Sequence, residues 1–265
     1  MSVSNKDSSA KTLPHRLSRS SYLPTVDPVG YATLETLSQA RHFNRWMASM
    51  VISWLKPGAS LEIGAGIGNL SQLVLEASFP LTVSDVHTDY LRLLRQRFTQ
   101  YAHFKGCHRL DIGSKDDTTG LQQDGQPFNN IFALNVIEHV EDDLQALANC
   151  HELLAPGGRA IILVPAFPWL YNVFDKHLGH FRRYTQKSLQ KKMQSVGFRI
   201  IHSQYFNAIG ILGWAFSGSL LRRPQIPASQ MKGFDLMVPL FRKIDPLFQS
   251  WMGLSVCCIG EKLPS

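Results

Sequence analysis

The fold of this chain is decided by the stretch Leu61-Glu62-Ile63-Gly64-Ala65-Gly66-Ile67-Gly68-Asn69-Leu70. The pattern is typical of an apolar strand, a glycine-rich turn and the beginning of a helix. Glycine permits positive φ and lets a ligand approach main-chain N–H groups, and a helix N-terminus adds a positive dipole end. A dinucleotide site has G-x-G-x-x-G, whereas Gly68 comes one position early and Asn69 stands where that glycine belongs. The spacing therefore favours a nucleotide site other than one for a pyrophosphate, and a turn that binds nothing is the alternative.

The same stretch resembles a known family. An acidic residue two positions before the first glycine, followed by G-x-G-x-G, resembles motif I of the class I S-adenosylmethionine (SAM) methyltransferases, and Glu62, Gly64, Gly66 and Gly68 match it position by position. The resemblance implies that these four residues bind SAM.

Further motifs follow in register. Residues 80–85 have the pattern of a second buried strand, which ends in a carboxylate about 20 residues after the first glycine. The resemblance implies that Asp85 binds the ribose of the cofactor. It also implies that Asp111 accepts a hydrogen bond from the adenine amine and that Ile112 packs on the adenine ring. The expected fourth strand runs into residues 137–143, which are similar to the segment that follows motif IV of the family. Asn135, at the end of that strand, is expected to join the cofactor site.

The strand pattern predicts the fold class. Five strand-and-helix units of roughly 25 residues, with nearly all-apolar strands, favour a parallel sheet covered on both faces. Two later runs, 198–206 and 254–260, are expected to form an antiparallel edge pair. We therefore expect an α/β fold with a Rossmann-like seven-stranded sheet, N-terminal helices and a helical insertion before the last strand. The expected strands of the five units are 61–63, 80–85, 104–112, 128–136 and 159–165.

Composition sets the bounds on domains and location. The chain has 265 residues, of which 44% are hydrophobic and 18% charged, and this suits one core. We expect a disordered tail over residues 1–24, which lack the apolar core of a signal peptide, and one methyltransferase domain over 25–265. The four cysteines do not form a disulfide or metal framework, and Cys257 and Cys258 are expected on opposite faces of a strand. A cytoplasmic location, or one peripheral to a membrane, is expected.

The net charge of +7 could indicate that the chain binds nucleic acid. The basic residues are scattered in short clusters, and they are not accompanied by a recognisable nucleic-acid-binding module. Anionic substrates or membrane surfaces suit this pattern as well, so no nucleic-acid partner is expected.

Two stretches outside the core are candidates for covering the site. Residues 28–55 carry apolar residues at helical spacing, and in similar methyltransferases such a helix caps the cofactor; Tyr31 is the candidate pocket residue there, with plain core packing as the alternative. Residues 166–185 are aromatic, broken by proline and placed at the carboxyl ends of the strands, where open α/β sheets bind ligands. We call residues 166–185 the lid.

The lid contains the run Asp-x-x-x-Gly-His-x-Arg-Arg-Tyr, from Asp175 through Gly179-His180-Phe181-Arg182-Arg183 to Tyr184. This run resembles a segment of bacterial SAM methyltransferases that act in small-molecule, lipid and saccharide pathways. His180 offers a titratable base, and paired guanidinium groups at Arg182 and Arg183 suit a carboxylate or phosphate. These arginines and Tyr184 are candidates for binding the acceptor. The alternatives are a structural histidine and ordinary surface arginines.

A third stretch, residues 207–253, is the apolar insertion. Its longest apolar run has about 14 residues, short of the 18 or more that span a bilayer. A homodimer interface, contact with a membrane surface and the wall of an apolar acceptor pocket all remain open.

Methyl transfer to an oxygen or an acidic carbon requires a base. His139 and His180 occupy suitable positions and are the candidate catalytic residues. His139 has a second interpretation as a metal ligand, since prenylquinone O-methyltransferases and small-RNA 2′-O-methyltransferases carry Glu-x-x-Glu-His there. Asn135 replaces the first carboxylate, so we expect no metal and activity that survives EDTA.

The function that the sequence favours is SAM-dependent methyl transfer to an oxygen, or failing that a carbon, of an apolar small-molecule or lipid-like acceptor. Two other classes stay open. One is a methyltransferase fold that catalyses a rearrangement or cyclisation without methylating, and the other is an RNA methyltransferase, which the positive charge suggests.

Overall fold

The computed structural model describes residues 28–221 and 227–264, so the predicted tail over residues 1–24 and the cluster at Arg222 and Arg223 lie outside the described residues. A seven-stranded sheet forms the centre of the molecule, with strand order β3-β2-β1-β4-β5-β7-β6. Strand β7 is antiparallel to both of its neighbours, β5 and β6, whereas the other paired strands are parallel. The expected Rossmann-like sheet is confirmed. Its strands are β1 (Ser60–Ile63), β2 (Leu81–Asp85), β3 (Phe104–Arg109), β4 (Phe128–Leu134), β5 (Leu154–Pro165), β6 (Phe198–Phe206) and β7 (Ser255–Lys262).

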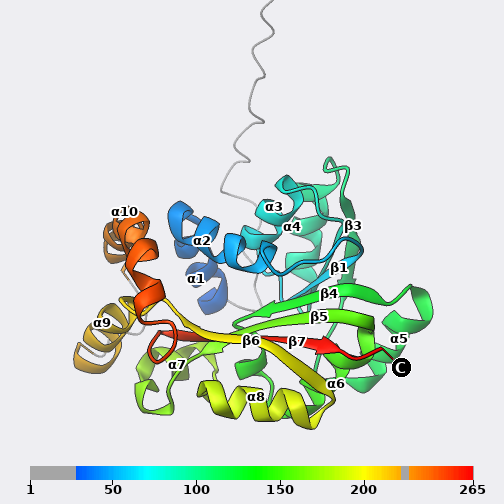
Figure 1. The fold of residues 1–265 in the computed structure, drawn as a ribbon. Helices are drawn as coiled ribbons and strands as arrows, with labels where there is room; N and C mark the ends of the chain where they lie inside the picture. Colours follow the sequence, from blue (N-terminus) through cyan, green and yellow to red (C-terminus); the bar gives the residue numbers. More distant parts are fainter. Residues whose placement is uncertain (1–27, 222–226, 265) are drawn as a thin grey trace, which may run out of the picture.

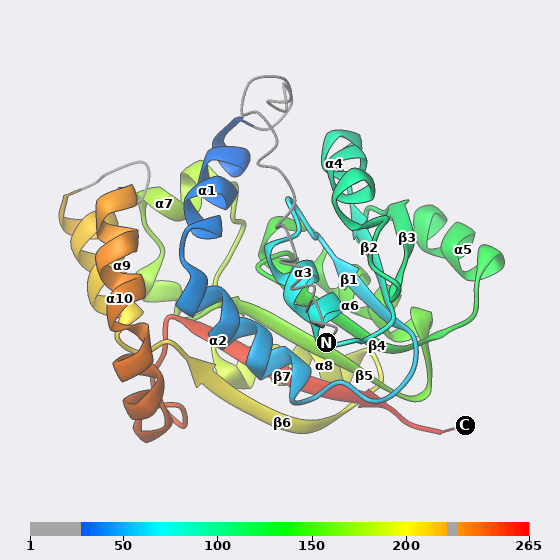
Figure 2. The same cartoon turned by 90° about the horizontal axis from the view of Figure 1, so that it is seen from above.

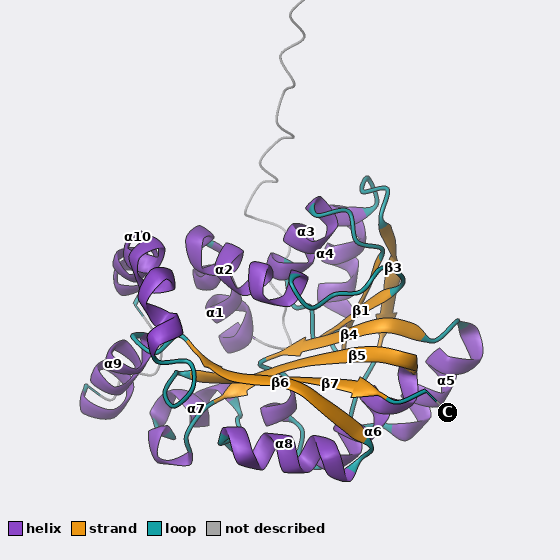
Figure 3. Ribbon diagram, viewed as in Figure 1, coloured by secondary structure: helices purple, strands orange, loops and turns teal. Residues whose placement is uncertain are grey.

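Helices cover both faces of the sheet (Figures 1 and 3). In the view of Figure 1, α2, α3 and α4 lie above the sheet, and α6 and α8 lie below it. Figure 2, seen from above, places α1 and α2 along the same side as α10. The helices are α1 (Pro28–Ser38), α2 (Arg41–Ile52), α3 (Asn69–Glu76), α4 (Thr88–Phe98), α5 (Lys115–Asp124), α6 (Asp143–Leu153), α7 (Val173–Leu178), α8 (Gln186–Ser195), α9 (Gly210–Trp214) and α10 (Ala228–Ile244).

Consecutive residues of the central strands enter two different cores. Ile131 and Ala133 of β4 pack into the core on one face, whereas Phe132 between them packs into the core on the other. Cys257 and Cys258 of β7 are divided in the same way, and both are buried free thiols. Because side chains alternate along a strand, an almost continuous apolar run is what a sheet covered on both faces requires.

Residues 28–55 form the expected N-terminal helices, α1 and α2. Several strands differ from their expected bounds: β3 ends at Arg109 rather than 112, and β4 ends at Leu134 rather than 136. Strand β5 begins at Leu154 rather than Arg159, because Leu154 already pairs with Phe128 before an irregularity shifts the register. Helix α5 is the helix of the third expected strand-and-helix unit, although it lacks the apolar stripe that would locate it in the sequence. Its N-cap is Ser114, whose hydroxyl accepts a hydrogen bond from the Asp117 backbone N–H.

The lid and the insertion meet at the carboxyl end of the sheet. The lid contains α7, and the insertion contains α9, a π-helical segment (Ala215–Leu220) and α10. Phe174 of α7 packs edge-on against Trp214 with ring centroids 4.9 Å apart. The insertion is tied in turn to α2, because the buried Asp235 carboxylate accepts a hydrogen bond from the Phe43 backbone N–H at 2.9 Å.

Candidate active site

The glycine loop between β1 and α3 requires glycine at three places. Gly64, Gly66 and Gly68 have φ values of +69°, +54° and +81°, a region that other residues rarely adopt. At Gly68, which caps the N-terminus of α3, a Cβ would lie 2.7 Å from the side chains of Leu94 and Phe98. The loop therefore presents bare backbone beside a helix N-terminus, an arrangement suited to a polar ligand.

Asp85 ends β2 and holds this loop in place. Its side chain is buried, with one oxygen accepting from the Gly66 N–H and the other from the His87 N–H, each at 2.9 Å. Burial raises the pKa of this carboxyl above its usual range, and the backbone N–H groups oppose that shift. The structure places Asp85 next to the loop, and its contact with a ribose stays a prediction.

Glu62 lies under the loop within β1. Its carboxyl is buried and accepts a hydrogen bond from the Ser71 hydroxyl at 2.5 Å. Burial raises the pKa of Glu62 to about 8, against the opposing effect of the Ser71 hydrogen bond. Glu62 therefore braces β1 against α3, and a carboxyl group with such a high pKa is largely protonated at neutral pH.

The other expected cofactor residues lie at the ends of β3 and β4. Asp111 is exposed and accepts from the Gly113 N–H at 2.9 Å, whereas Ile112 is buried in the core. Asn135 follows β4, is exposed and has φ +55°. Their contacts with adenine and cofactor remain predictions.

Backbone strain gathers at one edge of the sheet. Of the four non-glycine residues with positive φ among the described residues, three follow strands that point the same way: Asn135 after β4, Phe167 two residues after β5, and Asn207 after β6. The fourth, Ser78, precedes β2. Asparagine tolerates this region, but a bulky residue such as Phe167 does not. Such strain is concentrated at functional sites in proteins, so this edge is where a reaction is expected.

Helix α1 covers the glycine loop from the other side. A Cβ on Gly66 would lie 2.8 Å from the Leu34 side chain, and the Asn69 amide donates to the Leu34 carbonyl at 3.1 Å. Tyr31 is half-buried one turn before Leu34 on the same helix. The placement of α1 agrees with the cap expected over the cofactor, and a role for Tyr31 in binding stays a prediction.

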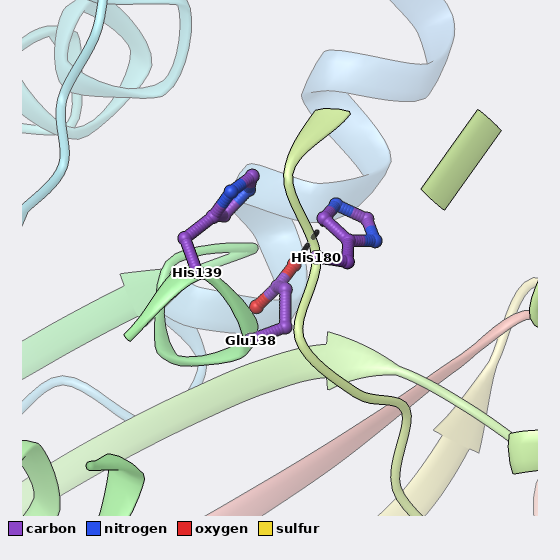
Figure 4. Close-up of side chains that lie close together, drawn as sticks. All are labelled: Glu138, His139 and His180. Atoms are coloured by element: carbon purple, nitrogen blue, oxygen red, sulfur yellow. Dashed lines mark ion pairs between the residues drawn. The ribbon is translucent and has the colours of Figure 1, made fainter. Parts of the chain in front are cut away.

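The two candidate catalytic histidines lie side by side (Figure 4). His139, in a 3-10 turn after β4, is exposed, and its ring centroid lies 4.6 Å from that of the buried His180. His180 Nδ1 lies 2.8 Å from Asp175 Oδ1, and His180 Nε2 lies 3.9 Å from Glu138 Oε1. The lid thus brings together residues that are far apart in the sequence.

Glu138 is the least expected member of this group. Its side chain is fully buried, and neither carboxylate oxygen has a hydrogen-bond partner among the described residues. Burial raises the pKa of Glu138 to about 8, and the nearby Arg183 charge opposes that shift. Sequence patterns gave no sign of this isolation, because Glu138 looks like any acid beside an exposed turn.

The lid arginines and tyrosine hold the lid rather than face solvent. Arg183 is buried, donates to Asp175 Oδ1 at 2.8 Å and to the Ala166 carbonyl, and lies over the Trp214 ring. Arg182 donates to the carbonyls of Val140 and Glu141, each at 2.7 Å. The Tyr184 hydroxyl, in a fully buried side chain, donates to Asp143 Oδ2 at 2.7 Å. In this conformation the three lid residues predicted to bind the acceptor make hydrogen bonds within the protein itself.

Two carboxylates that sequence reasoning missed organise the lid. Asp175 accepts from both His180 and Arg183, and these hydrogen bonds lower its pKa despite its burial. Asp143, at the start of α6, pairs with Lys192 at 2.8 Å and Arg182 at 3.3 Å, and these pairs lower its pKa. Asp175 was visible in the Asp-x-x-x-Gly-His run, but its spacing from His180 is not that of one helix face.

These residues fit SAM. Neighbouring side chains exclude any Cβ at Gly64, Gly66 and Gly68, so the loop offers bare backbone to a ligand, and a carboxylate at the end of the next strand suits the hydroxyl groups of a nucleoside. The strand order confines these groups to the carboxyl edge of β1, β2 and β4.

Comparison with known proteins gives the class. Residues 61–160 match the family model described as a methyltransferase domain. This match, the strand order and the glycine loop together support a class I SAM-dependent methyltransferase domain, and S-adenosylmethionine is the cofactor that this type of domain implies.

Individual relatives are about a third identical to this chain over the aligned residues, which make up only part of its length. The chain is 32% identical over 129 residues to a highly reducing polyketide synthase of Strobilurus tenacellus, covering 47% of this chain and 4% of that protein. It is 30% identical over 104 residues to a ubiquinone biosynthesis O-methyltransferase of Caulobacter sp., covering 38% of each chain. The chain thus spans only a small part of the polyketide synthases it matches.

A solved structure with a similar fold is the putative methyltransferase in complex with the Trm112 methyltransferase activator of Haloferax volcanii. It superposes with a TM-score of 0.61 at 12% identity, covering 92% of this chain and 100% of that chain. At this identity the likeness shows the fold alone.

Proposed function

We propose that this chain transfers the methyl group of SAM to an oxygen of an apolar small-molecule or lipid-like acceptor. The observation that carries the proposal is the Asp175–His180 pair beside the glycine loop. In the loop, a Cβ on Gly64 would lie 2.5 Å from Val136, and Val136 immediately precedes the turn that bears His139. A base held by the lid therefore lies near the place where the cofactor motif binds.

The proposed mechanism assigns each lid residue one task. Asp175 fixes the His180 ring through Nδ1, which leaves the Nε2 lone pair to take the proton of the acceptor hydroxyl. When bound, SAM supplies a methyl group on a positively charged sulfur, and this sulfur keeps the electrons of the broken C–S bond. His180 then releases its proton to solvent. Arg183 and Tyr184 position the lid, and Arg182 joins it to the segment after β4.

The proposal includes the cofactor contacts expected from sequence. Backbone of Gly64, Gly66 and Gly68 would contact the charged part of SAM, Asp85 the ribose, and Asp111 with Ile112 the adenine. Glu62 and Asn135 would complete that site. The matching O-methyltransferase of ubiquinone biosynthesis supports oxygen as the acceptor atom, and transfer to carbon is the alternative.

Tests of turnover require a defined acceptor. We suggest incubating the chain with SAM that carries a ¹³C-labelled methyl group and a panel of alkyl-substituted phenols, catechols and hydroxy fatty acids, with product detection by mass spectrometry. The His180→Ala variant should lower turnover by about 10²–10⁴-fold while SAM affinity, measured by calorimetry, stays within about twofold. Near-normal turnover of this variant between pH 6 and 9 would remove His180 from the mechanism and leave His139 as the candidate.

An apolar acceptor agrees with the surface of the insertion. Large apolar side chains there are exposed beside the basic residues Lys232, Arg242 and Lys243. Such a mixture suits a membrane surface with anionic lipids. Among the described residues, no helix is both long and apolar enough to cross a bilayer. The exposed large apolar residues of the insertion, among those the structure describes, are Leu212, Phe216, Leu220, Leu221, Leu236, Met237, Leu240, Leu247 and Trp251.

We therefore propose that this surface touches the membrane from which a lipid-like acceptor is drawn. Sedimentation with vesicles of phosphatidylcholine and phosphatidylserine should carry the chain down, and Leu236→Ser with Leu240→Ser should weaken this binding. The matched control Leu144→Ser removes an exposed leucine on α6. Equal sedimentation of both variants would refute the membrane contact, and a concentration-dependent dimer that the double variant abolishes would assign the surface to self-association instead.

A further inference from the structure

Three donor atoms converge at the carboxyl end of β4. Glu138, His139 and His180 each offer one ligand atom, and these atoms all lie within 4.8 Å of one another (Figure 4). Glu138 and His139 come from the turn after β4, whereas His180 comes from the lid. The cluster of three donor atoms is therefore formed by the lid together with the turn after β4.

The Glu138 carboxyl group lies in the kind of buried site where a metal ligand is found. Its side chain is 0% exposed, and both carboxylate oxygens lack a hydrogen-bond partner among the described residues. Leaving a buried carboxylate unpaired is costly. A cation that binds these oxygens would remove that cost, because buried charges in proteins are paired or coordinate metals.

His180 is prepared to bind the same cation. Because the Asp175 carboxylate accepts at Nδ1, the ring proton lies on Nδ1 and the Nε2 lone pair faces Glu138 Oε1 at 3.9 Å. Two ligand atoms that are each about 2.1 Å from one ion lie about 3–4 Å apart, so 3.9 Å leaves room for an ion between them. A carboxylate behind a ligating histidine is the usual second shell of a metal site.

We propose that Glu138, His139 and His180 bind one divalent transition-metal ion, with Zn²⁺ as the best match. Two imidazoles and one carboxylate are a donor set of catalytic zinc sites, which keep a further position open. Mg²⁺ prefers a shell of oxygens and fits less well. The missing carboxylate at Asn135 had argued against a metal, but sequence could not reveal that His180 supplies a third donor.

The ion would change how the acceptor loses its proton. With the ion bound, the metal would supply Lewis-acid chemistry that lowers the pKa of an acceptor hydroxyl in the open position. His180 would then serve as a ligand, in place of the role as base proposed for the metal-free chain. The oxygen would next form its bond to the methyl carbon as the C–S bond breaks toward sulfur. This role rests on the proposed function, whereas binding of the ion does not.

Calorimetric titration tests binding directly. The full chain is treated with EDTA, dialysed, and titrated with ZnCl₂ and separately with MgCl₂, without SAM or acceptor. We expect one Zn²⁺ per chain and Mg²⁺ affinity lower by at least about 100-fold. Glu138→Gln and His180→Ala should each weaken Zn²⁺ binding by at least about 100-fold, and Asp175→Asn by about 10–100-fold. The control His177→Ala, an exposed histidine on α7, should bind as the parent does.

A second measurement, the visible absorption of bound Co²⁺, uses the parent chain and therefore does not require that any variant folds. Co²⁺ bound in place of Zn²⁺ should give the intense visible absorption of a four- or five-coordinate site. Absence of stoichiometric Zn²⁺ binding, weak octahedral Co²⁺ bands, or unchanged affinity in folded Glu138→Gln would each overturn the proposal. Methyl transfer by protein that does not bind Zn²⁺ would reject the metal site and keep the proposed function. A chain that binds Zn²⁺ but methylates none of the panel would keep the metal site and reject the proposed function.

Discussion

Asp175 is the residue whose loss should affect the lid most. Its carboxylate is fully buried, and it accepts from His180 Nδ1 and Arg183 Nε, each at 2.8 Å, and from the Asn172 N–H at 2.9 Å. Asp175→Asn keeps the shape but removes the charge, so Arg183 stays buried beside a neutral amide. Removing one partner of a buried ion pair costs about 3–5 kcal/mol, and we expect the free energy of unfolding at pH 7 to fall by that amount.

The sign of the pH dependence follows from the direction of the pKa shift. The pKa of Asp175 lies below its ordinary value of 3.8 because His180 and Arg183 donate to its carboxylate. The stabilisation is therefore fully present above pH 3.8 and is lost as the pH falls through the folded-state pKa. The difference in stability between parent and Asp175→Asn should be constant from pH 5 to 8 and shrink only below about pH 4.

Urea denaturation followed by circular dichroism measures this difference, provided that parent and variant have equal m-values. The control Asp116→Asn changes an exposed carboxylate of α5 and should leave stability within about 0.5 kcal/mol. Adding Arg183→Met to Asp175→Asn should restore at least half of the loss, since no lone charge is then buried. A loss under about 1 kcal/mol, or no recovery in the double variant, would refute the reasoning.

Three further predictions concern the cofactor loop. Asp85→Ala should weaken binding of SAM and S-adenosylhomocysteine by about 1–3 kcal/mol, measured by calorimetry, because charged hydrogen bonds are lost; unchanged affinity would remove Asp85 from the site. Gly68→Ala should lower the melting temperature and weaken cofactor binding, since φ is +81° and the new Cβ would lie 2.7 Å from Phe98; a variant as stable as the parent would contradict this. Glu62→Gln should flatten the decline in cofactor-free stability between pH 4.5 and 8, because a pKa raised to about 8 favours folding below 4.5 and loses that contribution as the pH rises; equal slopes in urea titrations of both proteins would argue against it.

Much of the fold could be predicted from sequence because its signals are local. The Glu62-to-Gly68 motif and the apolar strands each act through residues close together in the chain, and the alternation at Cys257 and Cys258 follows from the two-residue period of a strand. The position of helix α5 could not be read from the sequence because this helix has no apolar stripe, and the early start of β5 depends on pairing with Phe128 across the sheet.

The candidate site likewise has features that the sequence predicts and features that only the structure shows. The sequence by itself determined where a glycine loop follows β1, which carboxylate ends β2, and that His139 and His180 are the histidines to consider. Only the tertiary structure decided that Asp175 orients His180 and that Arg183 donates to Asp175 rather than to an acceptor. It also decided that Glu138 is buried without a hydrogen-bond partner among the described residues. The physical reason is that periodicity and turn chemistry depend on neighbours in the chain, whereas burial and the pairing of charges depend on which segments the closed lid brings together.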